Sequence, residues 1–310
     1  MSEVRITRGE RDLGIETEGV EIARYVFRDD ADAFEGPKPF LHPVRTLSGA
    51  VVTGFRPWDH RWHKGLQMTL TDVSGENFWG GNTYVRGEGY VARDNVGRIR
   101  HDRFTAAEDG ETGEAATVGE ELTWITQAGE PWLSERRTQR FRGGQDGVWT
   151  LDVATTLTSI ADRELVLGSP TTNGRENAGY SGMFLRLARS FQGGSVTVPS
   201  DDGTVTRADA DVDELMGATA PWLAFSGPLD EVDGSATILA FAGASTGAPA
   251  IRWFVRSQPI AVLAPSPTFS ETVALAPGDE LSLTHRFVIA DGAHTGDDAA
   301  ALAARVSAEG

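Results

Sequence analysis

Two histidines, His60 and His63, lie in a segment where five of the six residues from 59 to 64 carry titratable side chains. Imidazole titrates near neutral pH, so both residues could act as acid or base. Asp59 is adjacent and could orient one ring and favour its charged form. We therefore predict that His60 and His63 are catalytic and that Asp59 and Lys64 contact the substrate. The alternative is that all four are ordinary polar residues of a loop.

A second polar cluster spans residues 169–182 and contains three glycines. Asn173, Arg175 and Tyr180 could bind hydroxyl or carboxylate groups, and the planar guanidinium is suited to bidentate contacts. Glu176 could serve as a base opposite the histidines. We predict these roles for the four residues. The alternative is a long structural turn whose Asn and Gly residues satisfy its own backbone.

Tryptophans accompany the histidine segment. Trp58 and Trp62 lie within it, and Trp79 follows further along the chain. An indole ring suits stacking on a sugar ring or another flat ligand. We predict that Trp79 contacts the substrate, whereas the alternative is that these tryptophans anchor a hydrophobic core.

The spacing of His60 and His63 is also a weak metal-binding pattern, because residues three apart in a loop or strand need not face one point. A zinc or non-haem iron ion would need a third ligand. The candidates for it are His42, His101, Asp59 and Glu176. We predict no cofactor, with a divalent metal bound by His42, His60 and His63 as the alternative. Otherwise His42 and His101 are expected to bind substrate.

Alternation with period two dominates the elements that must position these residues. From Trp149 to Ser159 the larger apolar side chains fall at odd positions, which is typical of a strand with one buried face. Similar segments recur between turn residues, including residues 50–55 and 66–73 on either side of the histidines. Residues 299–306 favour a helix, because capping and acidic residues precede them. We predict an all-β fold, a large antiparallel β-sandwich with one C-terminal helix, formed by one domain over residues 1–310.

One strand-like segment carries polar groups at alternate positions. Glu135, Arg137 and Gln139 would share one face of a strand. We predict that this face is solvated and that its charges pair across neighbouring strands.

The composition excludes several classes of function. With 28 Lys and Arg against 45 Asp and Glu, the net charge is −17, which disfavours nucleic acid and anionic membrane surfaces as partners. The absence of Cys removes disulfides and thiolate chemistry. No apolar run approaches the ~18–20 residues of a membrane span, and the first residues lack the apolar stretch of a signal peptide. We expect a cytoplasmic protein.

Two segments carry a family resemblance. Phe-Leu-His-Pro-Val-Arg-Thr at residues 40–46 and Asp-His-Arg-Trp-His-Lys-Gly-Leu at residues 59–66 resemble the PmoA-like proteins of unknown function. Shorter pieces at residues 78–79, 97–101 and 170–186 are similar too, so that the resemblance extends over about residues 36–292. In that family the second motif usually reads Asp-His-Pro-His-His, then Arg or Lys and Gly, so Trp62 stands where the family commonly has His.

The resemblance implies a large β-sandwich similar to galactose-mutarotase-like folds, often encoded in bacterial sugar-catabolic neighbourhoods. The family label mentions methane oxygenase, but the membrane subunit of that enzyme is built from spanning helices, which this sequence lacks. We therefore do not expect a methane monooxygenase. Because acid–base groups lie beside aromatic residues and Arg in the two polar segments, we expect a carbohydrate-active enzyme, an epimerase, lyase or hydrolase on a sugar or keto-sugar. The alternatives are a non-catalytic carbohydrate-binding or accessory protein and a His-ligated metal enzyme. The expected partner is a small-molecule carbohydrate, and the oligomeric state stays open.

Overall fold

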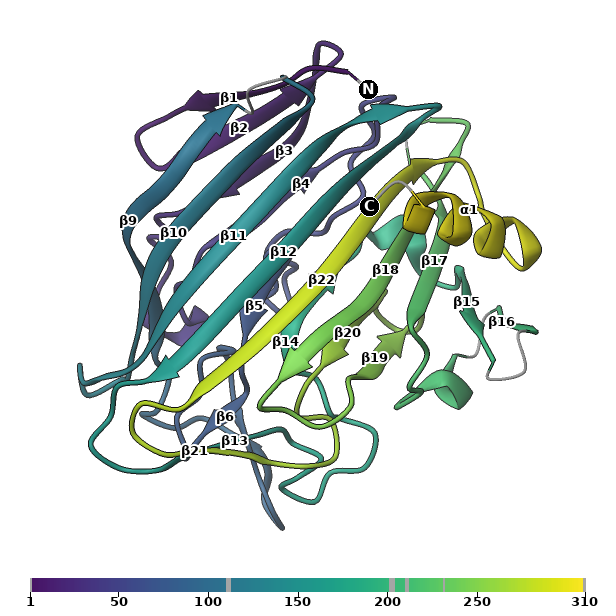
Figure 1. Ribbon diagram of the computed structural model, residues 1–310. Coiled ribbons are helices and arrows are strands. Elements are labelled where there is room, and N and C mark those ends of the chain that lie inside the picture. The colour runs from purple at the N-terminus through teal and green to yellow at the C-terminus, as the bar shows by residue number, and fades with distance from the viewer. Residues whose placement is uncertain (1, 110–112, 201–203, 210–211, 231, 309–310) are drawn as a thin grey trace.

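Strands make up most of the protein. The structure, a computed structural model, describes residues 2–109, 113–200, 204–209, 212–230 and 232–308. Within these residues the strands form two large antiparallel sheets and two small ones (Figure 1). The predicted all-β antiparallel sandwich with a C-terminal helix is therefore confirmed.

The larger sheet has nine strands among the described residues and faces the viewer in Figure 1. In spatial order they are β16 (Val205–Ala208), β15 (Ser195–Pro199), β17 (Trp222–Pro228), β18 (Ser235–Thr246), β22 (Glu280–Asp291), β12 (Val148–Ser159), β11 (Pro131–Gln145), β10 (Ala115–Ile125) and β9 (Arg98–Asp109). The long central strands pair in register over most of their length.

The second large sheet has eight strands in the described ranges and lies behind the first in Figure 1. In spatial order they are β1 (Val4–Arg8), β2 (Asp12–Thr17), β3 (Val20–Val26), β4 (Phe40–Val44), β5 (Leu66–Thr69), β14 (Gly182–Arg186), β20 (Val262–Ser266) and β19 (Arg252–Arg256). Its half from β5 to β19 is the part that supports the candidate site.

Smaller elements complete the described structure. A short sheet contains β21 (Val273–Leu275), β13 (Leu165–Gly168) and β6 (Asp72–Val73), and a hairpin contains β7 (Thr83–Val85) and β8 (Gly89–Val91). Three single-turn 3₁₀ helices are η1 (Ala33–Glu35), η2 (Arg189–Phe191) and η3 (Asp213–Leu215), and the α-helix is α1 (Asp297–Ala308). This helix begins within the predicted capping segment and packs Leu302 and Val306 on the outer face of the nine-stranded sheet.

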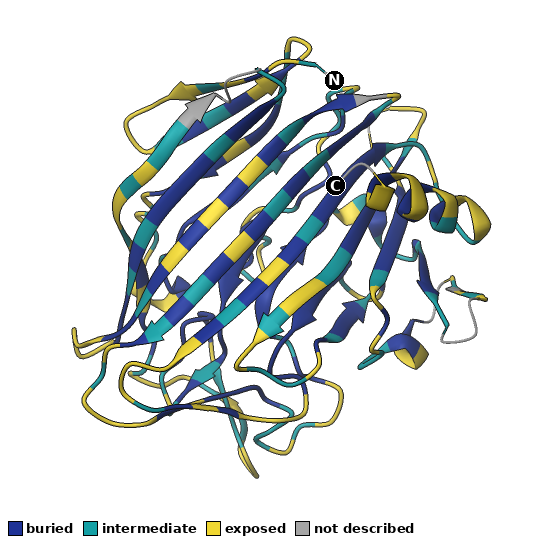
Figure 2. Cartoon of the chain, in the orientation of Figure 1, coloured by how far each residue is buried: buried dark blue, intermediate teal, exposed yellow. Residues whose placement is uncertain are grey.

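Alternating side chains fill the space between the two large sheets. Along β12 the odd positions from Trp149 to Leu157 are buried, as predicted, while Ala154 is exposed. The same alternation appears as dark and light bands along β11, β12 and β22 (Figure 2). Burial of each large apolar side chain contributes about 1.5–3 kcal/mol, so this continuous core is the main stabilising feature.

The residues flanking the histidines are less regular than expected. Residues 50–55 form no strand but only isolated bridges, with Thr53 opposite Leu187 and Phe55 opposite Lys64. Residues 66–73 divide between β5 and β6, which belong to different sheets. The chain therefore turns within what the pattern predicted to be a single strand.

The prediction of a solvated face on β11 is wrong. Glu135, Arg137 and Gln139 do share a face, but it points into the core, and Glu135 is 1% exposed. Leu133 and Phe141 lie on the same face at its two ends and are fully buried. Side chains alternate strictly along a strand. Burial of the apolar residues at the two ends of this face therefore places the polar residues between them in the core as well.

Candidate functional site

The candidate site lies on the outer face of the eight-stranded sheet. Along β14, Met183 and Leu185 point into the main core, whereas Phe184 joins a separate apolar cluster on the other side. Strand β19 follows the same rule, with Trp253 inward and Phe254 outward. Both faces of this region are therefore buried, which is unusual for an antiparallel sheet and indicates that something covers its outer face.

Loop residues provide that cover. The segment after residue 56 turns twice, with the backbone N–H of His60 bonded to the carbonyl of Pro57 and that of His63 bonded to the carbonyl of His60. The two imidazole rings stack with centroids 4.8 Å apart. His63 also packs 4.7 Å from Phe184, measured between ring centroids. The turns thus bring both histidines over the strand residues of the outer cluster.

A glycine pair allows Trp62 to sit flat against the next loop. A Cβ atom added to Gly81 would lie 2.6 Å from the Trp62 ring, and one added to Gly80 would lie 2.5 Å from the carbonyl oxygen of Glu35. Both glycines have positive φ, +101° and +70° for Gly80 and Gly81, which side chains rarely adopt. Asn77 fixes this loop by accepting the backbone N–H groups of Trp79 and Gly80, each at 2.9 Å.

These elements enclose a hollow of about 290 Å³. Its lining combines the histidine loop, the residues after Trp79, the β8 hairpin, the 175–180 segment and the strands beneath. The lining residues that matter for the argument are His60, His63, Trp79, Tyr90, Arg175 and Tyr180. Aromatic faces and polar tips thus converge on one concave surface, which is the usual composition of a small-molecule site.

The two histidines have different electrostatic environments. His63 is fully enclosed, and burial, followed by the charges of His60 and Arg186, holds its pKa well below the usual range. Its Nδ1 atom lies 3.4 Å from Nη1 of Arg186. Because a guanidinium can only donate, Nδ1 accepts and the ring proton resides on Nε2. His63 is therefore a neutral hydrogen-bond donor.

His60 lies at the rim, next to a carboxylate. Its Nδ1 atom is 2.9 Å from Oδ2 of Asp59, although this contact does not meet the criteria of a hydrogen bond among the described residues. Burial opposes ionisation of Asp59, yet the nearby His60 outweighs it and lowers the pKa of the carboxyl group.

A chain of hydrogen bonds crosses the opposite wall. Nη1 of Arg175 donates to the hydroxyl of Tyr90, and the hydroxyls of Tyr90 and Tyr180 lie 2.5 Å apart. Burial, followed by the interaction with Tyr90, raises the pKa of Tyr180 well above its ordinary value. Tyr180 thus stays protonated, and its hydroxyl can donate a hydrogen bond.

The structure brings together some of the predicted site residues. His60, His63, Trp79, Arg175 and Tyr180 line the hollow, and Asp59 contacts His60 from outside the lining. Asn173 lies in an adjoining hollow. The histidine loop and the segment from Arg175 to Tyr180 therefore lie over one concavity, but Glu176 does not line it.

Lys64 is structural in the fold. It is 0% exposed, and its Nζ atom lies 2.5 Å from Oδ2 of Asp29 and 3.5 Å from Oε2 of Glu35. Charged groups this deeply buried are retained only when paired. The pairing fixes the end of the histidine loop, so Lys64 positions the site without reaching its ligand.

His42 also lies outside the lining. Its Nδ1 atom is 2.9 Å from Oγ1 of Thr53, and its ring stacks on Phe55 with centroids 4.8 Å apart. Burial, followed by the charge of Arg45, lowers its pKa to about 4. The ring is thus committed to packing between β4 and the following segment.

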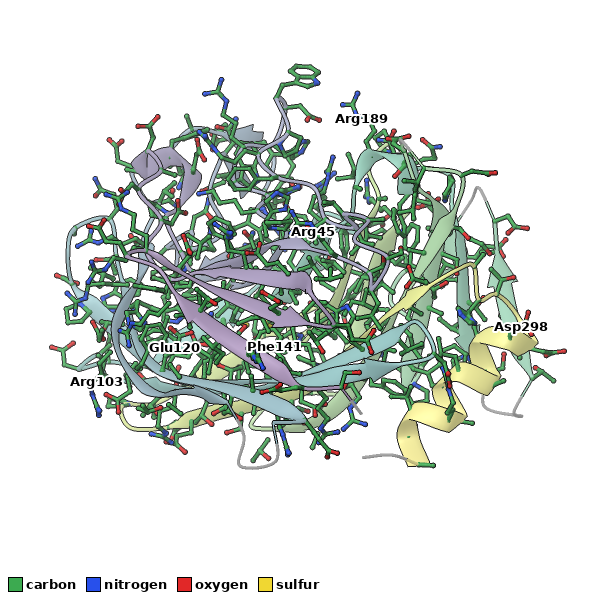
Figure 3. All side chains as sticks on the ribbon, turned by 90° about the horizontal axis from the view of Figure 1, so that it is seen from above. Arg45, Arg103, Glu120, Phe141, Arg189 and Asp298 are labelled. Carbon is green, nitrogen blue, oxygen red and sulfur yellow. The ribbon has the colours of Figure 1, made fainter. Side chains whose placement is uncertain are left out.

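His101 belongs to a separate part of the molecule. Its Nδ1 atom lies 2.8 Å from Oε2 of the buried Glu120, and it borders an open hollow of about 410 Å³ that also includes Arg103. In Figure 3, Glu120 and Arg103 lie at one end of the molecule, apart from Arg189, which follows the site strand β14. The hollow beside His101 shares no lining residue with the hollow beside the histidine loop, so His101 is not part of the candidate site.

Glu176 and Trp58 are exposed and lie outside the lining of the hollow. Trp58 is 82% exposed. Within the described residues, no group of three or more His, Asp or Glu side chains is arranged to hold a metal ion. His42, His60 and His63 are thus not assembled as the metal alternative requires.

Several lining residues escaped the sequence analysis. Phe184, Phe254 and Val262 form the floor, and Tyr90 and Arg256 form part of the rim. The floor residues had a signal, because a short strand with apolar residues at every position indicates burial on both faces. The rim residues had none, since nothing in the spacing along the chain links the β8 hairpin to β19.

The chain belongs to a family whose function is not known. Residues 12–304 match the model described as "Family of unknown function (DUF6807)". None of the curated proteins matches the sequence. The expectation of an unknown-function family is thereby supported, while the PmoA-like label is not part of this match.

The chain is also similar, at low identity, to two solved structures. The GH36 α-galactosidase AgaB from Geobacillus stearothermophilus is 12% identical, with a TM-score of 0.48 over 94% of this chain and 41% of that chain. The GalM/aldose epimerase homologue from C. elegans is 9% identical, with a TM-score of 0.35 over 94% and 100% of the two chains. The chain thus spans less than half the length of the α-galactosidase.

None of the described helices is both long enough and apolar enough to cross a bilayer.

Proposed function

We propose that the protein is a carbohydrate-active enzyme that takes a sugar into the hollow over β14, β19 and β20, with His60 as the proton-transferring group. The observation that carries this proposal is the convergence of stacked imidazoles, aromatic faces and a guanidinium on one concavity of about 290 Å³. Apolar ring faces with polar edges suit a sugar, whose own surface is divided in the same way.

The aromatic residues would hold the ring of the sugar. Trp79 packs 4.6 Å from both Tyr180 and Phe184, measured between ring centroids, so its position is fixed before a ligand arrives. Arg175 and the free hydroxyl of the Tyr90–Tyr180 pair would bind hydroxyl oxygens of the ligand. Such preorganised contacts reduce the entropy lost on binding.

His60 would exchange the proton. It lies at the rim beside Asp59, whose Oδ2 atom is 2.9 Å from its Nδ1 atom, and imidazole is the side chain that most often transfers protons in enzymes. His63 is neutral and enclosed, so its Nε2–H would stabilise developing negative charge on a ligand oxygen. The two rings therefore have separate roles, although the sequence treats them as equivalent.

The lining favours proton transfer over hydrolysis. Among the described residues, no Asp or Glu lines the hollow, whereas glycoside hydrolysis commonly uses two carboxyl groups about 5–9.5 Å apart. Glu176 does not supply the opposing base. An epimerisation, isomerisation or elimination that passes through a carbonyl-containing sugar fits a His-based site better.

The same observation supports a second candidate. A hollow rich in aromatics without a lining carboxylate also suits a carbohydrate-binding protein that performs no chemistry. In that case saccharide binding would persist without turnover.

The test compares the wild type with His60→Ala and with Arg61→Ala, an exposed neighbour outside the lining. Each protein is incubated with D-galactose, D-glucose, D-xylose, L-rhamnose and their 3-keto derivatives, and products are followed by proton NMR. We expect turnover of at least one compound, a loss of about 10²–10⁴-fold in His60→Ala, and no change in Arg61→Ala. Equal rates in His60→Ala and wild type would exclude the proposed role, and binding without turnover would support the second candidate.

A further inference from the structure

A second hollow adjoins the first. It has a volume of about 230 Å³ and shares the lining residues Trp79, Asn82, Tyr90 and Tyr180 with its neighbour. The hydroxyl contact between Tyr90 and Tyr180 therefore stands at the boundary of the two spaces. Together they form one groove with two compartments.

The size of the groove matters for the ligand. The first hollow alone, at about 290 Å³, lies at the lower bound of the ~300–1,000 Å³ typical of small-molecule sites. Only the two compartments together exceed that bound clearly. A ligand that fills the groove would extend beyond a single sugar ring.

Four arginines border the groove. Arg175 and Arg256 line the first hollow, and Arg86 and Arg93 line the second. Within the part of the chain that the structure describes, none of the four forms an ion pair with a carboxylate. This concentration of unpaired positive charge occurs in a chain whose net charge is −17, so it opposes the field of the rest of the molecule.

The contacts of these arginines leave their charge available. Arg86 donates from Nε to the carbonyl of Asn173 at 3.2 Å. Arg256 donates from Nη2 to the carbonyl of Asn177 at 3.3 Å, while its Nε atom is buried without a hydrogen-bond partner among the described residues. A buried donor without a partner costs free energy, and a ligand oxygen would satisfy it.

Among the described residues, one carboxylate lines the groove, that of Asp72 in the second hollow. Its Oδ1 atom accepts the backbone N–H of Gly75 at 2.8 Å, and its Oδ2 atom accepts the side-chain amide of Asn173 at 2.7 Å. Both oxygens are thus engaged in shaping the wall. The balance of charge along the groove remains positive.

We propose that the ligand is an acidic saccharide of at least two units, which places a sugar ring in the first hollow and an oxyanion group beside Arg86 and Arg93 in the second. The oxyanion is a carboxylate, a sulfate ester or a phosphate ester, since guanidinium groups bind all three through paired N–H donors. This inference rests on the proposed function, because it names the substrate class of the same site.

Isothermal titration calorimetry with matched saccharides tests the inference. Digalacturonate is compared with galabiose, its neutral digalactose counterpart, at 50 and 300 mM NaCl. Galabiose that carries one 6-sulfate or one 6-phosphate group, each against galabiose itself, then distinguishes the esters from the carboxylate. We expect at least one acidic compound to bind tenfold or more tightly than its neutral counterpart, with the difference reduced at the higher salt concentration by screening.

Variants locate the charge that is responsible. Arg86→Gln/Arg93→Gln should weaken binding of the preferred acidic compound about 10–100-fold, and more than it weakens binding of the neutral one. The control Arg98→Gln/Arg140→Gln removes the same charge from exposed positions outside the groove and should leave both affinities unchanged. An equal loss in the control would contradict the inference, because it would reflect net charge alone.

Failure of the inference is distinguishable from failure of the proposed function. If neutral saccharides bind as tightly as acidic ones, the substrate class is wrong while the saccharide site stands. If no saccharide of either kind binds, the proposed function itself is overturned.

Discussion

Replacing Glu135 with Gln hardly changes the shape of the side chain, but it should lower the stability of the protein strongly. Its carboxylate accepts four hydrogen bonds: from Nε and Nη2 of Arg137 at 2.8 and 2.9 Å, from Nε1 of Trp124 at 2.8 Å, and from Oγ1 of Thr155 at 2.6 Å. In Glu135→Gln an amide NH₂ group replaces one acceptor and faces these donors. Arg137 also loses its nearest compensating charge, while Glu120 lies farther away, at 3.8 Å.

The magnitude follows from burial. Removing one partner of a buried ion pair costs about 3–5 kcal/mol. At about 2.1 cal/mol/K per residue, 310 residues have an unfolding entropy of roughly 0.65 kcal/mol/K. The melting temperature of Glu135→Gln should therefore fall by roughly 5–8 °C.

Differential scanning calorimetry of three variants makes the comparison. Glu121→Gln is the control, because Glu121 pairs with Arg103 on the surface, where an ion pair contributes about 0–1 kcal/mol. Glu135→Leu/Arg137→Met replaces both charges by apolar groups and should recover much of the loss. If Glu135→Gln melted within about 2 °C of the wild type, the reasoning about this buried network would be refuted.

Three further predictions concern packing and pH. His285 is enclosed, and burial lowers its pKa to about 4. The free energy of unfolding should therefore fall by about 3 kcal/mol as the pH drops from 6.5 toward 4, because the unfolded chain binds a proton that the folded protein does not. In His285→Leu the midpoint of urea unfolding should depend less on pH. Gly81→Ala should displace Trp62 and weaken saccharide binding at least tenfold in calorimetry; unchanged affinity would contradict the close approach. Lys38→Met removes the ammonium that donates to the carbonyl of Trp79 at 3.0 Å, so the melting temperature should fall by several degrees, and a rise would refute the role of Lys38.

The sequence predicts the fold class well because its strands are long and alternate clearly. From Trp149 to Ser159 the larger apolar residues fall at odd positions, and those positions are buried. The C-terminal helix is equally well signalled by its capping segment. Local patterns of this kind need no knowledge of partners, since the side-chain period of a strand alone sets which face is buried.

The short strands near the site are less predictable. Residues 50–55 pair only through single bridges, one of which joins Thr53 to the distant Leu187, so their conformation depends on contacts outside the segment and not on their own pattern. On β11, polarity alone misassigned the face of Glu135 and Arg137. The flanking apolar residues of the same parity, Leu133 and Phe141, held the correct information.

Some residues of the candidate site could be predicted from their type, whereas others reach it only through tertiary structure. His60 and Trp79 could be selected because titratable and aromatic groups concentrate near them. His101 and Lys64 are titratable too, but their side chains are largely buried and paired with carboxylates, so they do not line the hollow. Tyr90 reaches the site only because the β7–β8 hairpin folds over the sheet, and no sequence spacing predicts that contact.

Two-dimensional NMR of the tryptophan indole N–H groups tests the central claim most directly, namely that a saccharide occupies the hollow beside the stacked histidines. The signals of Trp79 and Trp62, assigned by Trp→Phe variants, should shift when digalacturonate or galabiose is added. Those of Trp149 and Trp253, which lie in the main core, should not move. If both saccharides left all of these signals unchanged, or moved the core signals alone, the hollow would not be a saccharide site.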